Sequence, residues 1–245
     1  MQRIKLTISY DGTNFNGYQV QPNERTVQFE LEKALERIHK GKQVKVTASG
    51  RTDRFVHAVG QVIHFDTDLN LAPEKWERAL NTQLPGDILV RKAEPAAHDF
   101  HARFDAIRKE YRYKINRGPL PNLFQRNFEY HYPYPLDIKK IRQAAAYLLG
   151  THDFTSFSSA KSEVEDRIRS IYSIEIIEKE DEVTFQFIGN GFLYNMVRIL
   201  VGTLLEVGNG RRDPDSIPQL IAAKDRRLAG KAAPGHGLYL WRVEY

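Results

Sequence analysis

The chain has 245 residues, with 36 lysines and arginines against 31 aspartates and glutamates, for a formal net charge of +5. That length suffices for one large domain or two modest ones, and either can bury a sizeable core. Because the chain has no cysteine, disulfides, thiolate zinc sites and cysteine nucleophiles are excluded. The small positive excess permits an acidic partner such as nucleic acid without requiring one.

The sequence gives no sign of secretion or of a membrane segment. Residues 1–12 alternate polar and apolar types without the apolar core of a signal peptide. No apolar run approaches the roughly 20 residues that span a bilayer. Together with the absence of cysteine, this predicts a cytoplasmic protein with no membrane partner.

The first half begins with a strand, since Ile4, Leu6, Ile8 and Tyr10 alternate with polar residues. Thr26 is placed to cap a helix that Gly41 ends, and the apolar face of that helix comprises Val27, Leu31, Ala34, Leu35 and Ile38. Further elements are predicted at 43–48 (strand), 60–66 (strand), 73–82 (helix) and 87–93 (strand). The order βαββαβ is typical of a ferredoxin-like unit.

The second half repeats this order. Tyr111, Tyr113 and Ile115 alternate with charged residues in a strand. Further elements are predicted at 136–149 (helix), 168–178 and 183–189 (a strand hairpin), 191–207 and 214–223 (helices) and 238–245 (strand), with an irregular stretch at 117–135. We therefore predict an α+β fold of two ferredoxin-like units, 1–105 and 106–245, joined side by side into one sheet with flanking helices.

Residues 50–58, GRTDRFVHA, carry the strongest chemical signal. Arg51 and Asp53 are two residues apart, so an extended backbone points both to the same side. A guanidinium beside a carboxylate favours the ionised form, which suits a nucleophile or a base. The alternative is a structural Arg–Asp pair, which is the commoner arrangement in an arbitrary loop.

Long segments of the chain resemble the tRNA pseudouridine synthase A (TruA) family. They are ISYDGTNFNGYQVQPNERTVQFELEKAL near the start, GRTDRFVHAVGQVIHF, FHARFDAIRKEYRY, GNGFLYNMVRILVGTLLEVG and AGKAAPGHGLYLWRVEY at the end. The resemblance covers essentially the whole chain. It implies a pseudouridine-synthase fold and places the catalytic nucleophile at Asp53, an active-site tyrosine at Tyr111 and a basic active-site residue at Arg198.

The chain departs from the family pattern at three positions. Phe55 stands where the family usually has glycine, Asp105 where a small hydroxyl residue is common, and Lys231 where threonine or another small residue is usual. A bulky residue at 55 is expected to alter the backbone path beside the nucleophile, because glycine tolerates dihedrals that phenylalanine does not. Asp105 adds a negative charge near the expected RNA path.

The resemblance implies chemistry without metal or cofactor, because forming pseudouridine involves no net oxidation or hydrolysis. It implies that Tyr111 contacts the detached uracil, that Arg198 pairs with Asp53, and that Arg51 binds phosphate or helps extrude the target base. The residues alone leave other readings open. Tyr111 lies on the apolar side of its strand, as a core tyrosine would, and a helix arginine such as Arg198 is ordinarily solvated.

Two histidines near the nucleophile, His57 and His64, have no metal-ligand partner at a convincing spacing. We interpret His57 as a hydrogen-bonding residue that orders the loop.

Basic residues gather around the second family segment, and those expected to bind RNA along with Arg51 and Tyr111 are Arg103, Arg108 and Lys109. A second group comprises Arg211, Arg212, Lys224, Arg226, Arg227 and Lys231. Acidic residues interrupt both groups, and a run of charge is more often simply a solvated face. The resemblance further implies a homodimer that grips one tRNA.

These expectations lead to an isomerase that converts uridine to pseudouridine in the anticodon stem-loop of tRNA, at positions 38 to 40 by family resemblance. The alternative from another class is a tRNA-binding or folding protein on the same scaffold, with turnover reduced or lost because of Phe55. A carboxylate-dependent hydrolase is disfavoured, because no second acid lies at a recognisable motif spacing.

Overall fold

The computed structural model describes residues 1–159 and 164–245. The chain divides into two compact units. Unit 1 comprises Met1–Ile107 with Tyr239–Tyr245, and unit 2 comprises Arg108–Leu238. Within the described residues, no helix combines the length and the apolar character needed to cross a membrane.

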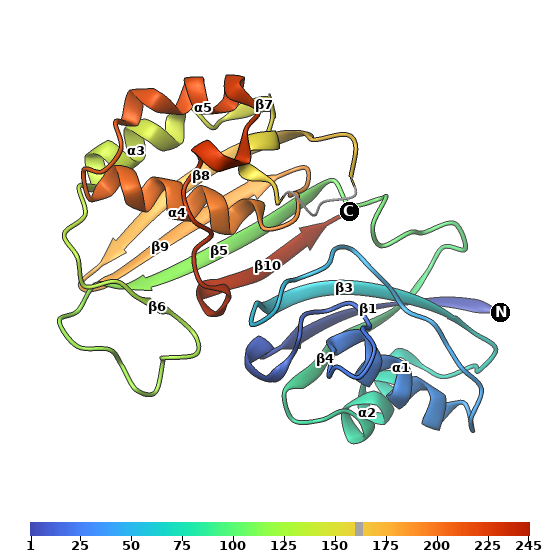
Figure 1. Ribbon diagram of the computed structural model, residues 1–245. Coiled ribbons are helices and arrows are strands. Elements are labelled where there is room, and N and C mark those ends of the chain that lie inside the picture. Colours follow the sequence, from blue (N-terminus) through green and yellow to red (C-terminus); the bar gives the residue numbers. More distant parts are fainter. Residues whose placement is uncertain (160–163) are drawn as a thin grey trace. The chain divides into compact units, whose positions relative to one another are not determined.

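Unit 1 has the predicted element order. Its elements are β1 (Gln2–Tyr10), α1 (Val27–Ile38), β2 (Thr47–Ala48), β3 (His57–Thr67), α2 (Pro73–Gln83), β4 (Ile88–Ala96) and β10 (Leu238–Glu244). The strands β4, β1 and β3 lie side by side and antiparallel, and β3 also pairs with β2 and, in parallel, with β10. Figure 1 shows α1 and α2 together on one face of these strands. This is a ferredoxin-like arrangement, and the α+β class is confirmed.

The core of unit 1 follows from the alternation in β1. Its even-numbered residues Ile4, Leu6, Ile8 and Tyr10 are buried, and Leu6 lies opposite Ile63 of β3. Helix α1 begins where predicted, because the Thr26 hydroxyl accepts from the Phe29 amide. The two helices cover the sheet with the buried side chains of Val27, Leu31, Ala34, Leu35, Trp76 and Leu80.

The strand predicted at 43–48 is wrong in extent, since β2 covers only Thr47–Ala48. Val44 and Val46 are buried as a strand pattern suggests. However, the Val46 amide donates to the Glu32 side chain of α1 at 3.2 Å rather than to a neighbouring strand. Burial therefore arises from packing on a helix, without a strand ladder.

Unit 2 contains β5 (Arg108–Asn116), β6 (Tyr130–His131), α3 (Ile138–Ala146), β7 (Gly150–Asp153), β8 (Ile168–Lys179), β9 (Glu182–Gly189), α4 (Met196–Gly208) and α5 (Ile217–Ala223). Its strands lie in the order β5-β9-β8-β7, with β6 on the other edge of β5. The predicted hairpin is present, with Lys179 opposite Glu182. The predicted final strand is β10, whose residues from Tyr239 onward group with unit 1.

Helix α4 begins at Met196, so the start predicted at residue 191 is wrong. Asn195 has φ of 61°, a left-handed conformation that breaks the helix. The Tyr194 carbonyl also accepts from the Ser159 amide. The predicted apolar stripe is nevertheless buried throughout, comprising Leu193, Met196, Val197, Leu200, Val201 and Leu204.

Candidate active-site segments

The candidate nucleophile lies in the loop between β2 and β3 of unit 1, which we call the nucleophile loop (residues 50–56). Arg51 is exposed, Thr52 is buried and Asp53 is half-buried. Thr52 anchors the loop, because its carbonyl accepts from the Tyr18 amide at 3.0 Å and its hydroxyl shares a 2.8 Å hydrogen bond with the Tyr10 hydroxyl. Burial raises the pKa of Tyr10, so this phenol stays neutral and the bond persists at ordinary pH.

The segment after β1 packs against the backbone of the nucleophile loop. A Cβ atom on Gly12 would lie 2.2 Å from the Val56 carbonyl oxygen, and one on Gly17 would lie 2.9 Å from the Thr52 carbonyl oxygen. Gly17 also has φ of +88°, which glycine adopts readily. The two glycines thus let two backbones touch, and the position of Asp53 is fixed by backbone packing.

His57 orders the same loop, as predicted. Its Nδ1 accepts from the Gly12 amide at 2.9 Å, and its ring stacks on Tyr239 at a centroid distance of 4.8 Å. The Asp11 carboxylate lies 3.3 Å from the same Nδ1. Since Nδ1 already accepts from Gly12, we assign the neutral ring with its proton on Nε2 rather than an ion pair.

Phe55 adopts a left-handed conformation with φ of 67°. Such a conformation costs a bulky residue about 1–2 kcal/mol, whereas glycine adopts it freely. The expectation that Phe55 alters the backbone path is therefore not supported, because the residue occupies a conformation natural to glycine. Phe55 is 38% exposed, and the Arg54 guanidinium carbon lies 4.5 Å from the ring centroid.

Tyr111 lies on β5 of unit 2, where it is 8% exposed. It is opposite Phe187 in the sheet, and its ring meets Phe192 edge-on at 5.1 Å. Tyr113, on the same side of β5, is fully buried and donates to the Pro234 carbonyl at 2.8 Å. Tyr111 is thus built into the apolar surface of the strand, and this core setting does not conflict with a role at the substrate.

Arg198 lies in the first turn of α4 and is half-buried. Its Nε donates to the Ala233 carbonyl and its Nη1 to the Asn195 side chain, both at 2.7 Å. These two acceptors fix the guanidinium, so the expectation of a freely solvated helix arginine is wrong. A cation at a helix N-terminus opposes the helix dipole, and helix stability therefore does not account for an arginine at this position.

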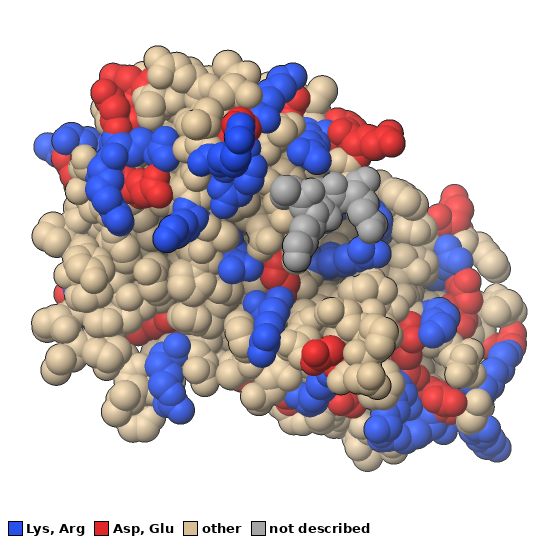
Figure 2. All heavy atoms as spheres, viewed as in Figure 1, with Lys and Arg blue, Asp and Glu red and all other residues tan. Residues whose placement is uncertain are grey.

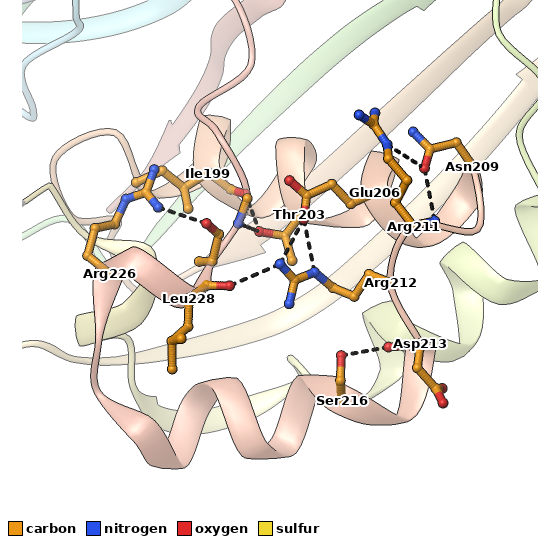
Figure 3. Close-up of polar contacts among 12 residues, drawn as sticks. Ile199, Thr203, Glu206, Asn209, Arg211, Arg212, Asp213, Ser216, Arg226 and Leu228 are labelled. Atoms are coloured by element: carbon orange, nitrogen blue, oxygen red, sulfur yellow. Dashed lines mark hydrogen bonds and ion pairs between the residues drawn. The ribbon is translucent and has the colours of Figure 1, made fainter.

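The segment 229–233 is packed tightly on α4. A Cβ atom on Gly202 would lie 1.8 Å from the Lys231 carbonyl oxygen. The Thr203 hydroxyl accepts from the Gly230 amide at 3.0 Å. Arg212 reinforces this packing by binding Glu206 and the Leu228 carbonyl, at 2.8 and 2.9 Å (Figure 3). These contacts hold in place the segment that carries Ala233, and the Ala233 carbonyl in turn holds Arg198.

Most cations of the second basic group have local partners. Arg226 donates to the Ala229 carbonyl, Lys224 pairs with Asp153 at 2.8 Å, and Arg227 pairs with Asp225 at 2.7 Å. Figure 2 likewise shows acidic and basic side chains interspersed on the face it presents. These arginines and lysines act first in holding unit 2 together.

The residues predicted to bind RNA are distributed over both units. Arg51 and Arg103 belong to unit 1, whereas Arg108 and Lys109 belong to unit 2. Arg103 and Arg108 are exposed and lie over the rings of Phe104 and Tyr172, at 5.7 and 5.6 Å. Lys109 is half-buried on β5.

Neither histidine near the nucleophile forms a metal site. His64 is 6% exposed and its Nδ1 accepts from the Ala102 amide at 3.1 Å. Burial, with Arg3 nearby, lowers the pKa of His64 to about 4. Across the residues described, no group of histidine, aspartate and glutamate side chains could hold a metal ion.

Sequence reasoning missed three contributors to these segments. Arg54 stacks on Phe55, Asn195 orients Arg198, and the Ala233 carbonyl holds the same arginine. Asparagine's tolerance of left-handed backbone was a signal for Asn195, but a backbone carbonyl 35 residues from Arg198 carries none.

Comparison with known proteins identifies the family. A family model described as tRNA pseudouridine synthase matches residues 6–105 and 144–245. The chain is 60% identical to tRNA pseudouridine synthase A 1 of Bacillus cereus, covering 100% of this chain and 99% of that protein. It is 59% identical to tRNA pseudouridine synthase A of a Geobacillus species, with coverage of 100% and 98%.

Among solved structures, a chain of a Cbf5–Nop10–Gar1 complex is similar at 16% identity, with a TM-score of 0.34 and coverage of 82% of this chain and 54% of that one. The family assignment depends on the family model and on the full-length relatives, and not on this structure. The chain therefore belongs to the tRNA pseudouridine synthase family, whose members are isomerases.

Proposed function

We propose that this isomerase converts uridine to pseudouridine in the anticodon stem-loop of tRNA, at positions 38 to 40. The observation that carries the proposal is the 60% identity over the full length of a relative named tRNA pseudouridine synthase A 1. In the reaction the bond from C1′ to N1 breaks, the base turns while bound, and C1′ bonds to C5. The proton leaves C5 and N1 gains one, so atoms and electrons balance without a further reactant.

Asp53 is proposed as the nucleophile. Its carboxylate can attack C1′, add to C6 of the base, or remove a sugar proton, and every one of these routes needs the ionised form away from bulk water. Its half-buried position in a backbone-packed loop supports this role. A carboxylate held in one place reacts faster, because less orientational entropy is lost at the transition state.

Tyr111 and Arg198 are proposed to complete the chemistry. An aromatic side chain set in an apolar strand surface suits contact with a detached uracil, whose faces are themselves apolar. Arg198 is proposed as the cation that keeps the Asp53 carboxylate ionised. Its two fixed acceptors, Ala233 and Asn195, support this role because they prevent the guanidinium from turning toward solvent.

The remaining proposed contacts are electrostatic. Arg51 binds phosphate or fills the gap left by the extruded base, and Arg103, Arg108 and Lys109 contact the tRNA backbone. Such contacts predict that affinity falls as salt concentration rises. We further propose that the protein acts as a homodimer, as the family resemblance implies. We also propose that it acts in the cytoplasm, because the absence of cysteine fits a reducing compartment. A tRNA-binding role without turnover is not retained, because Phe55 leaves the loop in a glycine-like conformation.

The test is site-resolved pseudouridine mapping on unmodified tRNA transcripts, with no added metal or cofactor. Wild type is expected to modify the anticodon arm, and Asp53→Asn to lose at least about a thousandfold in rate while still binding the transcript. Asp68→Asn is the matched control, because it removes one carboxylate from an exposed pair with Lys42. Absence of product from folded, tRNA-binding wild type would refute the proposed function, and an active Asp53→Asn would refute the nucleophile.

A further inference from the structure

Phe55 combines a left-handed backbone with an exposed aromatic side chain. Its backbone is left-handed, with φ of 67°, and the residue is 38% exposed. Strained backbone of this kind persists only where surrounding structure enforces it, and it occurs often at functional sites. Here the Phe55 amide approaches the Phe15 carbonyl at 3.5 Å, and Gly12 packs against the carbonyl of the next residue, Val56. The backbone is enforced, yet the ring points away from the core.

The partner of the ring is a cation. The Arg54 guanidinium carbon lies 4.5 Å from the Phe55 centroid, as in a cation–π pair. Arg51 and Arg54 are both exposed, and neither has an ion-pair partner among the described residues of unit 1. An aromatic ring, the guanidinium stacked on it and a second exposed cation therefore flank the candidate nucleophile Asp53 along the nucleophile loop.

This combination matches the chemistry of an unpaired nucleobase. Single-stranded nucleic acid is bound by aromatic rings that stack on base faces and by arginines that contact phosphate and stack in turn. A uridine drawn out of a loop leaves neighbouring bases without their stacking partner. An exposed ring beside the nucleophile can replace that partner.

We propose that Phe55, backed by Arg54, is a stacking platform for an unpaired base adjacent to the target uridine, an inference that rests on the proposed function. Phe55 is then a positioning residue, because it stacks on the adjacent base and thereby holds the target uridine near Asp53. The strained backbone has a purpose in this account, since it turns the ring outward beside the nucleophile. If Phe55 instead obstructed the site, removing its ring would raise turnover.

The first experiment measures the affinity of an unmodified anticodon stem-loop RNA for three variants. Phe55→Leu keeps an apolar side chain and the same backbone strain but removes the aromatic face, and we expect affinity to fall about 5- to 100-fold. Phe55→Tyr keeps the face and is expected to bind within about twofold of wild type. Arg54→Gln is expected to weaken binding and to reduce its dependence on salt.

The second experiment places an abasic site at each unpaired loop position of the same RNA in turn. At the position that stacks, the abasic RNA should bind wild type as weakly as intact RNA binds Phe55→Leu, and combining both changes should add no further loss. Full additivity at every position, or a Phe55→Leu variant with wild-type affinity, overturns the platform. Wild-type turnover on the same RNA tests the proposed function separately, so failure of the stacking platform can be distinguished from failure of the proposed function.

Discussion

The nucleophile loop and the start of α4 contain the same unusual backbone feature in different settings. Each has a non-glycine residue in left-handed conformation close to a candidate catalytic side chain, Phe55 near Asp53 and Asn195 near Arg198. Asparagine is enriched in this conformation, and the Asn195 side chain accepts from Arg198. Phenylalanine is not, and the Phe55 ring is exposed.

The difference shows how to interpret backbone strain. At Asn195 the residue type, the conformation and the hydrogen bond to Arg198 explain one another within unit 2. At Phe55 the conformation opposes the residue type. The segment after β1 enforces the backbone through Phe15 and Gly12, whereas the exposed side chain contacts only the Arg54 guanidinium among the ring and cation contacts that the structure describes in unit 1. An exposed aromatic side chain on a strained backbone therefore points to a molecule that binds there, and four predictions compare the two regions.

The largest expected effect is at Gly202, which allows the segment that carries the Ala233 carbonyl, an acceptor of Arg198, to lie close to α4. Gly202→Ala would bring a Cβ atom to 1.8 Å from the Lys231 carbonyl oxygen, and its other near neighbours are also backbone atoms, of Lys231 and Ala233. We expect the free energy of unfolding to fall by about 3 kcal/mol or more, measured by urea denaturation. Gly86→Ala is the control, because nothing lies within 4 Å of its added Cβ. A loss under about 1 kcal/mol would mean that segment 229–233 yields easily.

Acid should lower the stability of unit 1 more than that of unit 2, because His64 lies in β3 of unit 1. Burial and Arg3 lower the pKa of His64 from 6.5 to about 4 in the folded protein, so the folded state binds fewer protons than the unfolded chain. This contribution to stability is complete above pH 6.5 and falls as the pH drops toward 4. After allowance for solvent screening we expect a loss of about 2 kcal/mol at full protonation.

Hydrogen exchange at pH 7 and at pH 5 measures that loss separately in β3 and in α4. We expect faster exchange at the lower pH in β3, after correction for the intrinsic rate. The control is His64→Asn, whose side-chain oxygen can accept from the Ala102 amide as His64 Nδ1 does, and which should flatten the pH response. An unchanged pH response in this variant would assign the effect to another group.

Asn195 should show a moderate effect that divides between stability and catalysis. Asn195→Ala forces a residue less tolerant of left-handed backbone and removes one acceptor of Arg198, so we expect a loss of about 1 kcal/mol. Turnover should fall about tenfold, mainly in kcat. Asn195→Gly relieves the backbone but not the missing acceptor, and it should lose kcat with little loss of stability. Equal kcat in both variants and wild type would show that this hydrogen bond does not position Arg198.

Phe55→Gly is expected to change stability least. Glycine removes about 1–2 kcal/mol of strain but adds about 0.5–1 kcal/mol of conformational freedom to the unfolded chain. The free energy of unfolding should therefore be unchanged or higher by up to about 1.5 kcal/mol, measured by urea denaturation beside Asn195→Gly. A loss above about 1 kcal/mol would mean that the ring stabilises unit 1, which would weaken the contrast between the two residues.

Local patterns in the sequence predicted most of the elements. Alternation located β1, β5 and the hairpin of β8 with β9, and the apolar stripe located α4, because side-chain periodicity reflects which face is buried. The strand at 43–48 was overestimated, because Val46 bonds to a glutamate on α1 instead of a strand. The pairing of β10 with β3 joins residues far apart in sequence, and periodicity contains no information on partners.

The candidate site was predictable as a list of residues but not as an arrangement. The family resemblance supplied Asp53, Tyr111 and Arg198. The residues alone favoured a structural ion pair for Asp53, a core position for Tyr111 and a solvated position for Arg198. The acceptors that fix Arg198 depend on the close approach at Gly202, which only the folded chain reveals. The left-handed backbone of Phe55 was hidden for the same reason, since it is imposed by the segment after β1.

The placement of β10 also bears on how the protein is made. Tyr239–Tyr245 belong to unit 1, yet the ribosome adds them about 130 residues after Ile107. At the usual rates of synthesis, roughly ten seconds or more pass between the two. During that interval the part of β3 that leads out of the nucleophile loop has no strand on the edge that Tyr239 and Leu240 later occupy. A nascent chain released before β10 is made thus keeps Asp53 but lacks the strand against which His57 stacks, so the candidate nucleophile region is complete only after β10 has been synthesised.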